Sequence, residues 1–274
     1  MNMPQSLHAL DCPLMRERRG NVAILVLNRP PLNLLDQALR RAIREQVELL
    51  GKDESVRAIV LTGGGAHFCA GANLHESLLR ADPETARQHA ENGHAMTKAL
   101  LDCRKPLVAA LEGVCLGGGY ELALACDVRV AGRTSKVGLP EIHRNLWPGT
   151  GGMHLLVRAI GMGAARLMML EGQPIDAQEA LCRGLVDKVV PEGAALEAAV
   201  DWAARLGERS ADAWNMIKQL TDNAAVQSFQ DYCATEAQAY VAWYQTTHAQ
   251  TGIRAFLDKK KSKRNQDEGK RDGR

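Results

Sequence analysis

The stretch GVCLGGGYELALACDVRVAG, residues 113–132, decides the fold that this sequence predicts. Three consecutive glycines at 117–119 separate an apolar run from a run with helical spacing, and Glu121 follows two residues later. Three glycines are a costly start for a helix, because glycine loses more backbone entropy on folding than any other residue. Glycines do, however, let the backbone approach a ligand closely. The first amides of a helix have no intrahelical acceptor, so they are available to bind that ligand.

Strand-like and helix-like segments alternate on both sides of this stretch. The runs NVAILVLNRPP (21–31), VRAIVLTGGG (56–65) and KPLVAALEG (105–113) are short and apolar and end in turn residues, which is typical of buried strands. LDQALRRAIREQVELLG (35–51) has helical spacing. This order predicts βαβ units and a parallel sheet, with the glycine clusters 63–65 and 117–119 at the edge where α/β sheets bind ligands.

The character of the sequence changes after about residue 150, where nearly all segments are helical and LVDKVV (185–190) is the clear exception. We therefore predict an α/β core over residues 1–190 and a helical region over 191–258. The lysine-rich residues 259–274 are expected to form a basic, frayed tail.

Composition narrows the possible classes of protein. The 274 residues carry a net charge of +2, with 46% hydrophobic and 24% charged residues, which is ordinary for a globular protein. No apolar run approaches the ~20 residues that span a bilayer, and the N-terminus does not resemble a signal peptide. We expect a cytoplasmic protein without a membrane or nucleic-acid partner.

Several catalytic motifs are missing from the sequence. It has no GxxxxGK[ST] phosphate loop, no GxSxG elbow and no HExxH pair. The seven cysteines form no CxxC pair and are expected to be buried free thiols. His89 and His94 are expected on a solvated helix face. No metal site is predicted.

Two glycine-rich turns, FCAGANL (68–74) and CLGGGYE (115–121), remain as candidates for chemistry. Facing each other, they would offer two backbone N–H groups to one oxygen, which is an oxyanion hole. The residues alone leave open whether the turns do this or only allow tight strand-to-helix connections. The helix dipole favours an ionised Glu121, a base, whereas burial of Glu141 between Pro140 and Ile142 would raise its pKa and suit an acid.

Four separated motifs together resemble the crotonase superfamily of enoyl-CoA hydratases and isomerases. They are HFCAGANLHE (67–76), the glycine-rich stretch 113–132, GLPEI with PGTGG (138–142 and 148–152), and EALCRGLVDKVVP (179–191). The likeness covers roughly residues 20–260. It implies an α/β crotonase (ClpP/crotonase-like) fold, with repeated ββα units, parallel sheets and a helical C-terminal trimerisation region.

The resemblance also implies roles for particular residues. Ala72 and Gly118 would supply the oxyanion-hole amides, Glu121 would activate water and Glu141 would donate a proton. The substrate would be an acyl-CoA, with no cofactor beyond coenzyme A itself, and the assembly a homotrimer or hexamer. The expected CoA-binding residues are Ala70, Gly71, Ala72, Asn73, Leu74, His75, Gly117, Gly118, Phe256 and Lys259.

The sequence keeps other functions open. A Δ3-Δ2 enoyl-CoA isomerase needs one proton-shuttling carboxylate, so two glutamates favour a hydratase, and a decarboxylase or C–C lyase would use the same enolate chemistry. An RNA-binding relative would use the basic tail, but no aromatic residues are interleaved with its charges. Asn73 stands where the family usually has Asp, and Tyr120 and Trp147 are bulky for positions near an acyl pocket.

Overall fold

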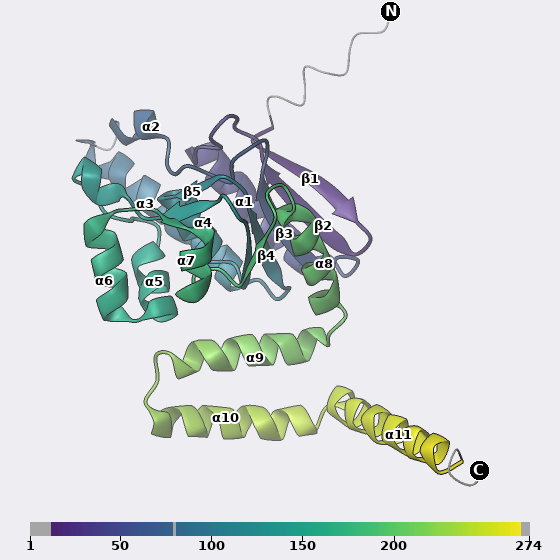
Figure 1. Ribbon diagram of the computed structural model, residues 1–274. Coiled ribbons are helices and arrows are strands. Elements are labelled where there is room, and N and C mark those ends of the chain that lie inside the picture. Colours follow the sequence, from purple (N-terminus) through teal and green to yellow (C-terminus); the bar gives the residue numbers. More distant parts are fainter. Residues whose placement is uncertain (1–11, 79–80, 270–274) are drawn as a thin grey trace, which may run out of the picture. The chain divides into compact units, whose positions relative to one another are not determined.

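The computed structural model describes residues 12–78 and 81–269 (Figure 1). Its larger sheet has six strands. The first pair of strands is antiparallel and the others are parallel. In spatial order the strands are β1 (Leu14–Arg19), β2 (Val22–Leu27), β3 (Ala58–Gly63), β4 (Leu107–Leu111), β6 (Val128–Gly132) and β9 (Lys188–Val190).

Both faces of this sheet are covered, which explains the continuous apolar runs in its strands. In β2, Ala23, Leu25 and Leu27 face one hydrophobic core, and Val22, Ile24 and Val26 face the other. The first core is shared with helices α1 (Gln37–Lys52), α3 (Pro83–Leu101) and α4 (Gly118–Leu124).

Helix α8 (Ala195–Gly207) covers the second face of the sheet. Its alanines 195, 199 and 203 are fully buried there, and their small side chains let the helix lie close to the strands. The predicted α/β core therefore extends past residue 190, since α8 packs on β3 and β4. The chain forms two compact units, and the boundary between them lies after Trp214.

A smaller sheet carries the glycine-rich stretch. It consists of β5 (Val114–Leu116), β7 (Lys136–Gly138) and β8 (Ile175–Asp176). The remaining helices of the first unit are α2 (Leu74–Leu78), α5 (Gly152–Ile160), α6 (Met162–Glu171) and α7 (Ala177–Cys182). In this unit, β5 leads directly into α4, so the start of α4 is fixed by strand pairing.

The second unit, from residue 215, is helical as predicted. Helix α9 (Ala211–Ala224) begins in the first unit, and α10 (Phe229–Tyr244) and α11 (Thr247–Gly269) follow. Helix α11 continues past residue 258, where the sequence predicts a frayed tail, and residues 270–274 lie outside the described residues.

The seven cysteines are free thiols, but they are not all buried. Cys69, Cys103, Cys115 and Cys126 are buried, whereas Cys12, Cys182 and Cys233 are exposed, so the expectation of burial is wrong for these three. Cys12 precedes β1, Cys182 ends the short helix α7, and Cys233 lies on α10, so none of them is inside the packed sheet.

Candidate active site

The two glycine-rich turns lie side by side because strand pairing joins the segments that lead into them. Cys69 and Cys115 form a parallel β-bridge. Cys69 N donates to Val114 O at 3.1 Å, and Leu116 N donates to Cys69 O at 2.9 Å. The turns that follow, at residues 70–73 and 117–119, are therefore held in register.

The amides of Ala72 and Gly118 meet at this point. A Cβ placed on Gly118 would lie 3.7 Å from Ala72 N, and one on Gly71 would lie 3.8 Å from Gly118 N. Within the described part of the chain, neither N–H has a backbone acceptor. Gly118 begins α4, where a helical amide has no intrahelical partner. Two backbone donors without backbone acceptors in the described ranges therefore lie close together, an arrangement that can hydrogen-bond to a single oxygen atom.

Leu35, just before α1, supports the Ala72 side of this pair. It forms a parallel bridge with Ala72, in which Leu35 N donates to Gly71 O at 2.9 Å and Asn73 N donates to Leu35 O at 3.0 Å. These bonds use the groups on both sides of Ala72 and leave its own N–H free to face a ligand.

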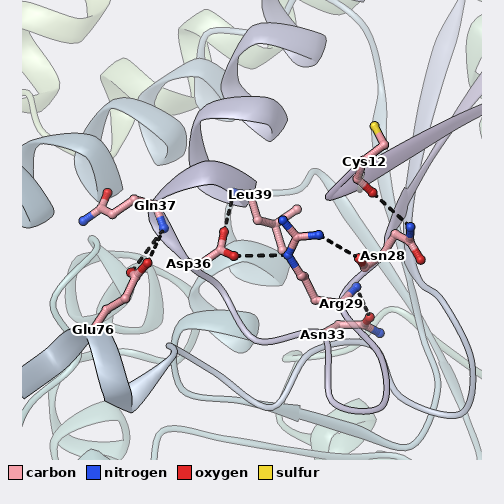
Figure 2. Close-up of polar contacts among 8 residues, drawn as sticks. All are labelled: Cys12, Asn28, Arg29, Asn33, Asp36, Gln37, Leu39 and Glu76. Atoms are coloured by element: carbon pink, nitrogen blue, oxygen red, sulfur yellow. Dashed lines mark hydrogen bonds and ion pairs between the residues drawn. The ribbon is translucent and has the colours of Figure 1, made fainter. Parts of the chain in front are cut away.

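A dense set of polar contacts fixes this approach to α1 (Figure 2). Asp36 caps the helix by accepting from Leu39 N at 2.6 Å, and its other oxygen pairs with Arg29 Nε at 3.1 Å. Both carboxylate oxygens of Glu76, on α2, accept from Gln37 N at 3.4 and 3.2 Å. The carboxylates thus satisfy the helix N-terminus next to the segment that holds Ala72.

Glu121 lies in the first turn of α4 and is only 2% exposed. Its Oε1 accepts two backbone hydrogen bonds, from Thr150 N at 2.9 Å and Gly152 N at 2.8 Å. Gly152 is the first residue of α5 and Thr150 lies just before its N-cap, so the helix dipole also favours a negative charge here. Gly152 must be a glycine because a Cβ would lie 2.7 Å from Glu121 Oε1.

Glu141 begins a 3₁₀ turn, Glu141–Arg144. A Cβ on Gly117 would lie 2.9 Å from Glu141 Oε1, so this carboxyl borders the glycine turn of the hole. Burial raises the pKa of Glu141 to about 7, and the charge of Glu121 acts in the same direction. The two glutamates therefore differ in environment as an acid and a base require.

The structure places the other predicted CoA-binding residues as follows. Ala70 N donates to Leu32 O at 2.9 Å, and Asn73 Oδ1 accepts from His75 N at 3.1 Å, so the loop leading into α2 is ordered by its own bonds. Leu74 and His75 are exposed. Phe256 lies on α11 in the second unit and is 67% exposed, and the side chain of Lys259 lies outside the described residues.

Tyr120 is fully buried, and its hydroxyl donates to Leu185 O at 3.5 Å. One expectation about a neighbouring residue is wrong. His89 is not on a solvated face, because α3 packs on α1 and its Nδ1 lies 2.6 Å from Gln37 Nε2. His94, by contrast, is exposed, and so is Trp147.

Sequence reasoning missed three residues of the site. Thr150 and Gly152 bind Glu121 through their amides, a role that side-chain chemistry does not reveal. Arg40, on α1, is only 1% exposed, with its guanidinium near Gly118. Its helical spacing from Ile43 and Val47, both buried, was the available signal.

Among the residues that the structure describes, no group of three or more His, Cys, Asp or Glu side chains could hold a metal ion. No helix in the described ranges is long and apolar enough to cross a membrane.

Comparison with known proteins agrees on one family. The model for enoyl-CoA hydratase/isomerase matches residues 17–267. A 2,3-dehydroadipyl-CoA hydratase from Escherichia coli (strain K12) is 36% identical over 248 residues, covering 90% of this chain and 96% of that protein. A short-chain-enoyl-CoA hydratase from Clostridium acetobutylicum is 32% identical over 247 residues, covering 89% and 94%.

Solved structures show the same relationship. Pseudomonas aeruginosa DspI superposes with a TM-score of 0.86 at 34% identity, covering 93% of this chain and 98% of that chain. An enoyl-CoA hydratase from Polaromonas sp. JS666 gives a TM-score of 0.85 at 32% identity, covering 90% and 97%. With this fold and these relatives, the chain belongs to the enoyl-CoA hydratase/isomerase family of the crotonase superfamily.

Proposed function

We propose that the protein is an enoyl-CoA hydratase, which adds water across the 2,3 double bond of a 2-enoyl-CoA thioester. The observation that carries the proposal is the contrast between its two glutamates. Glu121 is a carboxylate held by two backbone N–H groups, whereas burial raises the pKa of Glu141 to about 7. The two backbone donors suit Glu121 to accept a proton, and the raised pKa suits Glu141 to donate one.

In the proposed reaction, the thioester oxygen accepts hydrogen bonds from the amides of Ala72 and Gly118. Glu121 removes a proton from water as the water oxygen bonds to Cβ, and the π electrons move to give an enolate whose negative oxygen lies in the hole. The Glu141 proton then forms the new bond to Cα. A final proton transfer from Glu121 to Glu141 through solvent restores both groups.

Two carboxyl groups favour hydration over isomerisation. An isomerase moves one proton between two carbons and needs one shuttling carboxylate in a site that excludes water. Here Glu121 and Glu141 both border the glycine turns, so one can activate water while the other protonates carbon. The proposed reaction uses no metal or redox cofactor. Coenzyme A takes part in it only as a portion of the substrate.

The test is incubation of the purified protein with crotonyl-CoA, following loss of the conjugated enoyl-thioester absorbance. We expect rapid loss with the wild type, a severe reduction with Glu141→Gln, and no change with Glu192→Gln, an exposed control. Undiminished hydration by Glu141→Gln would remove that residue from the mechanism. No absorbance loss with crotonyl-CoA or longer 2-enoyl-CoA esters would contradict the proposed function.

A further inference from the structure

Arg40 is a buried cation whose hydrogen-bond donors are largely unused. It projects from α1 and is 1% exposed. Within the ranges that the structure describes, its Nε and Nη1 are buried and have no hydrogen-bond partner. Burying guanidinium donors without hydrogen bonds is strongly unfavourable, so Arg40 calls for a functional explanation.

The guanidinium lies near Gly118, and the charge of Glu121 acts on it. A Cβ on Gly118 would be 3.8 Å from Arg40 Nη2, on the same side as Ala72 N. A Cβ on Gly93, in α3, would be 2.8 Å from Arg40 Nη1 and 3.2 Å from Thr150 Cβ. The absence of side chains at both glycines is therefore what leaves space for Arg40.

Nearby carboxylates balance the charge of Arg40 without using its donors. Burial lowers the pKa of Arg40, and Glu121 is the strongest of the groups that oppose this, with Glu76 and Asp36 also contributing. Yet Glu121 Oε1 accepts from the amides of Thr150 and Gly152. Asp36 and Glu76 accept from the N-terminus of α1, and Asp36 also from Arg29 (Figure 2).

Thr150 adds a second unused polar group. In the described part of the chain, its Oγ1 is buried without a partner, while its backbone oxygen accepts from Thr97 Oγ1 at 2.7 Å. A Cβ on Gly93 would contact both Arg40 Nη1 and the Cβ of Thr150, the atom that carries Oγ1, so the guanidinium and Thr150 are neighbours. Donors of this kind match the oxygens of a carboxylate, which accepts several charge-assisted hydrogen bonds.

We propose that Arg40, assisted by Thr150, binds a carboxylate on the acyl group, so that the preferred substrates are CoA monothioesters of short dicarboxylic acids. The inference rests on the proposed function only in placing an acyl-CoA at the hole. Because Arg40 Nη2 lies so near the hole, the second carboxylate is separated from the thioester by a short chain.

The test compares binding of two saturated esters with five-carbon acyl groups, glutaryl-CoA and valeryl-CoA, by isothermal titration calorimetry. We expect the wild type to bind glutaryl-CoA more tightly. Arg40→Met should weaken glutaryl-CoA binding at least about tenfold relative to valeryl-CoA, as expected for lost charge-assisted hydrogen bonds. Arg41→Met, at an exposed position on the same helix, should keep the wild-type preference.

Three results would overturn the inference: a wild type that prefers valeryl-CoA, equal weakening of both esters by Arg40→Met, or no change in that variant. Arg40→Lys, which keeps the charge with fewer donors, should retain part of the preference and serves if Arg40→Met does not fold. Both esters are saturated and cannot be hydrated, so this binding test is independent of catalysis. If the protein fails to hydrate crotonyl-CoA but still shows an Arg40-dependent preference for glutaryl-CoA, only the proposed function is rejected.

Discussion

Glu141 makes the proposed reaction sensitive to pH near neutrality. Burial raises the pKa of its carboxyl to about 7, so the proton that it must donate is largely present below pH 7 and is lost above it. We expect kcat/KM for a 2-enoyl-CoA to fall by about tenfold per pH unit on the alkaline side, as one essential acid titrates. A profile that stays flat to pH 9 would show that Glu141 is not the acid.

The same group also affects folding stability. In the unfolded chain Glu141 has an ordinary pKa, so the folded state binds the extra proton, and stability falls as pH rises from about 4.5 to about 7. Glu141→Gln cannot ionise and should therefore gain stability over the wild type across this interval. Urea denaturation at pH 4.5 and pH 8 gives the free energy of unfolding of both proteins. A stability difference between Glu141→Gln and the wild type that is the same at the two pH values would contradict this prediction.

Gly152 tests how closely Glu121 is held. A Cβ at this position would lie 2.7 Å from Glu121 Oε1, so Gly152→Ala must displace the carboxylate or the start of α5. We expect a loss of kcat of about 100-fold, because small misplacement of a catalytic group is expensive. Gly163→Ala on α6 is the matched control, since its Cβ would meet nothing within 4 Å. Equal activity of the two variants would refute the assigned role.

At the scale of elements, the N-terminus of α1 links helix capping to the hole. Asp36 accepts from Leu39 N and pairs with Arg29, and the adjacent Leu35 pairs with the segment around Ala72. Asp36→Ala should lower the free energy of unfolding by about 1–2 kcal/mol. It should also reduce kcat/KM, because Leu35 loses its fixed position, and both quantities can be measured on one preparation.

Asp82→Ala is the control for this prediction. Asp82 caps α3 by accepting from Thr85 N at 2.8 Å, away from the Leu35 bridge. The Asp82→Ala substitution should lower the free energy of unfolding by a similar amount but leave kcat/KM unchanged. If both variants lower kcat/KM equally, the effect comes from general loss of stability rather than from the position of Leu35.

The elements that the sequence predicts are those with strong periodicity. Strands were predicted correctly from the buried apolar runs of β2 and β3. A helix was predicted correctly from the spacing of Leu39, Ile43 and Val47 in α1. The very short β7 and β8 were missed, because two or three residues carry no usable period. Arg40 was missed because a charged side chain on a helix is normally solvated, and only tertiary packing buries it.

At the scale of the whole chain, the candidate site was predictable only in part. The glycine turns and both glutamates stand out locally, and their order matches a known family. The amides that bind Glu121 come from residues 150 and 152, and the support for Ala72 comes from residue 35. These contacts connect distant parts of the chain, and a single sequence does not show which of them meet.

The C-terminal unit leads to the last prediction, on assembly. Its helices expose large apolar side chains, including Phe229 at 82%, Ile217 at 63% and Val241 at 61%, and Val241 lines a hollow with Leu220 and Tyr240. A surface this apolar usually marks an interface. The resemblance to the crotonase superfamily implies a homotrimer or hexamer, so we expect light scattering to give three or six times the chain mass of 29.8 kDa. Val241→Asp should yield smaller species, unlike Thr134→Asp at an exposed turn of the first unit; a monomeric wild type would refute the prediction.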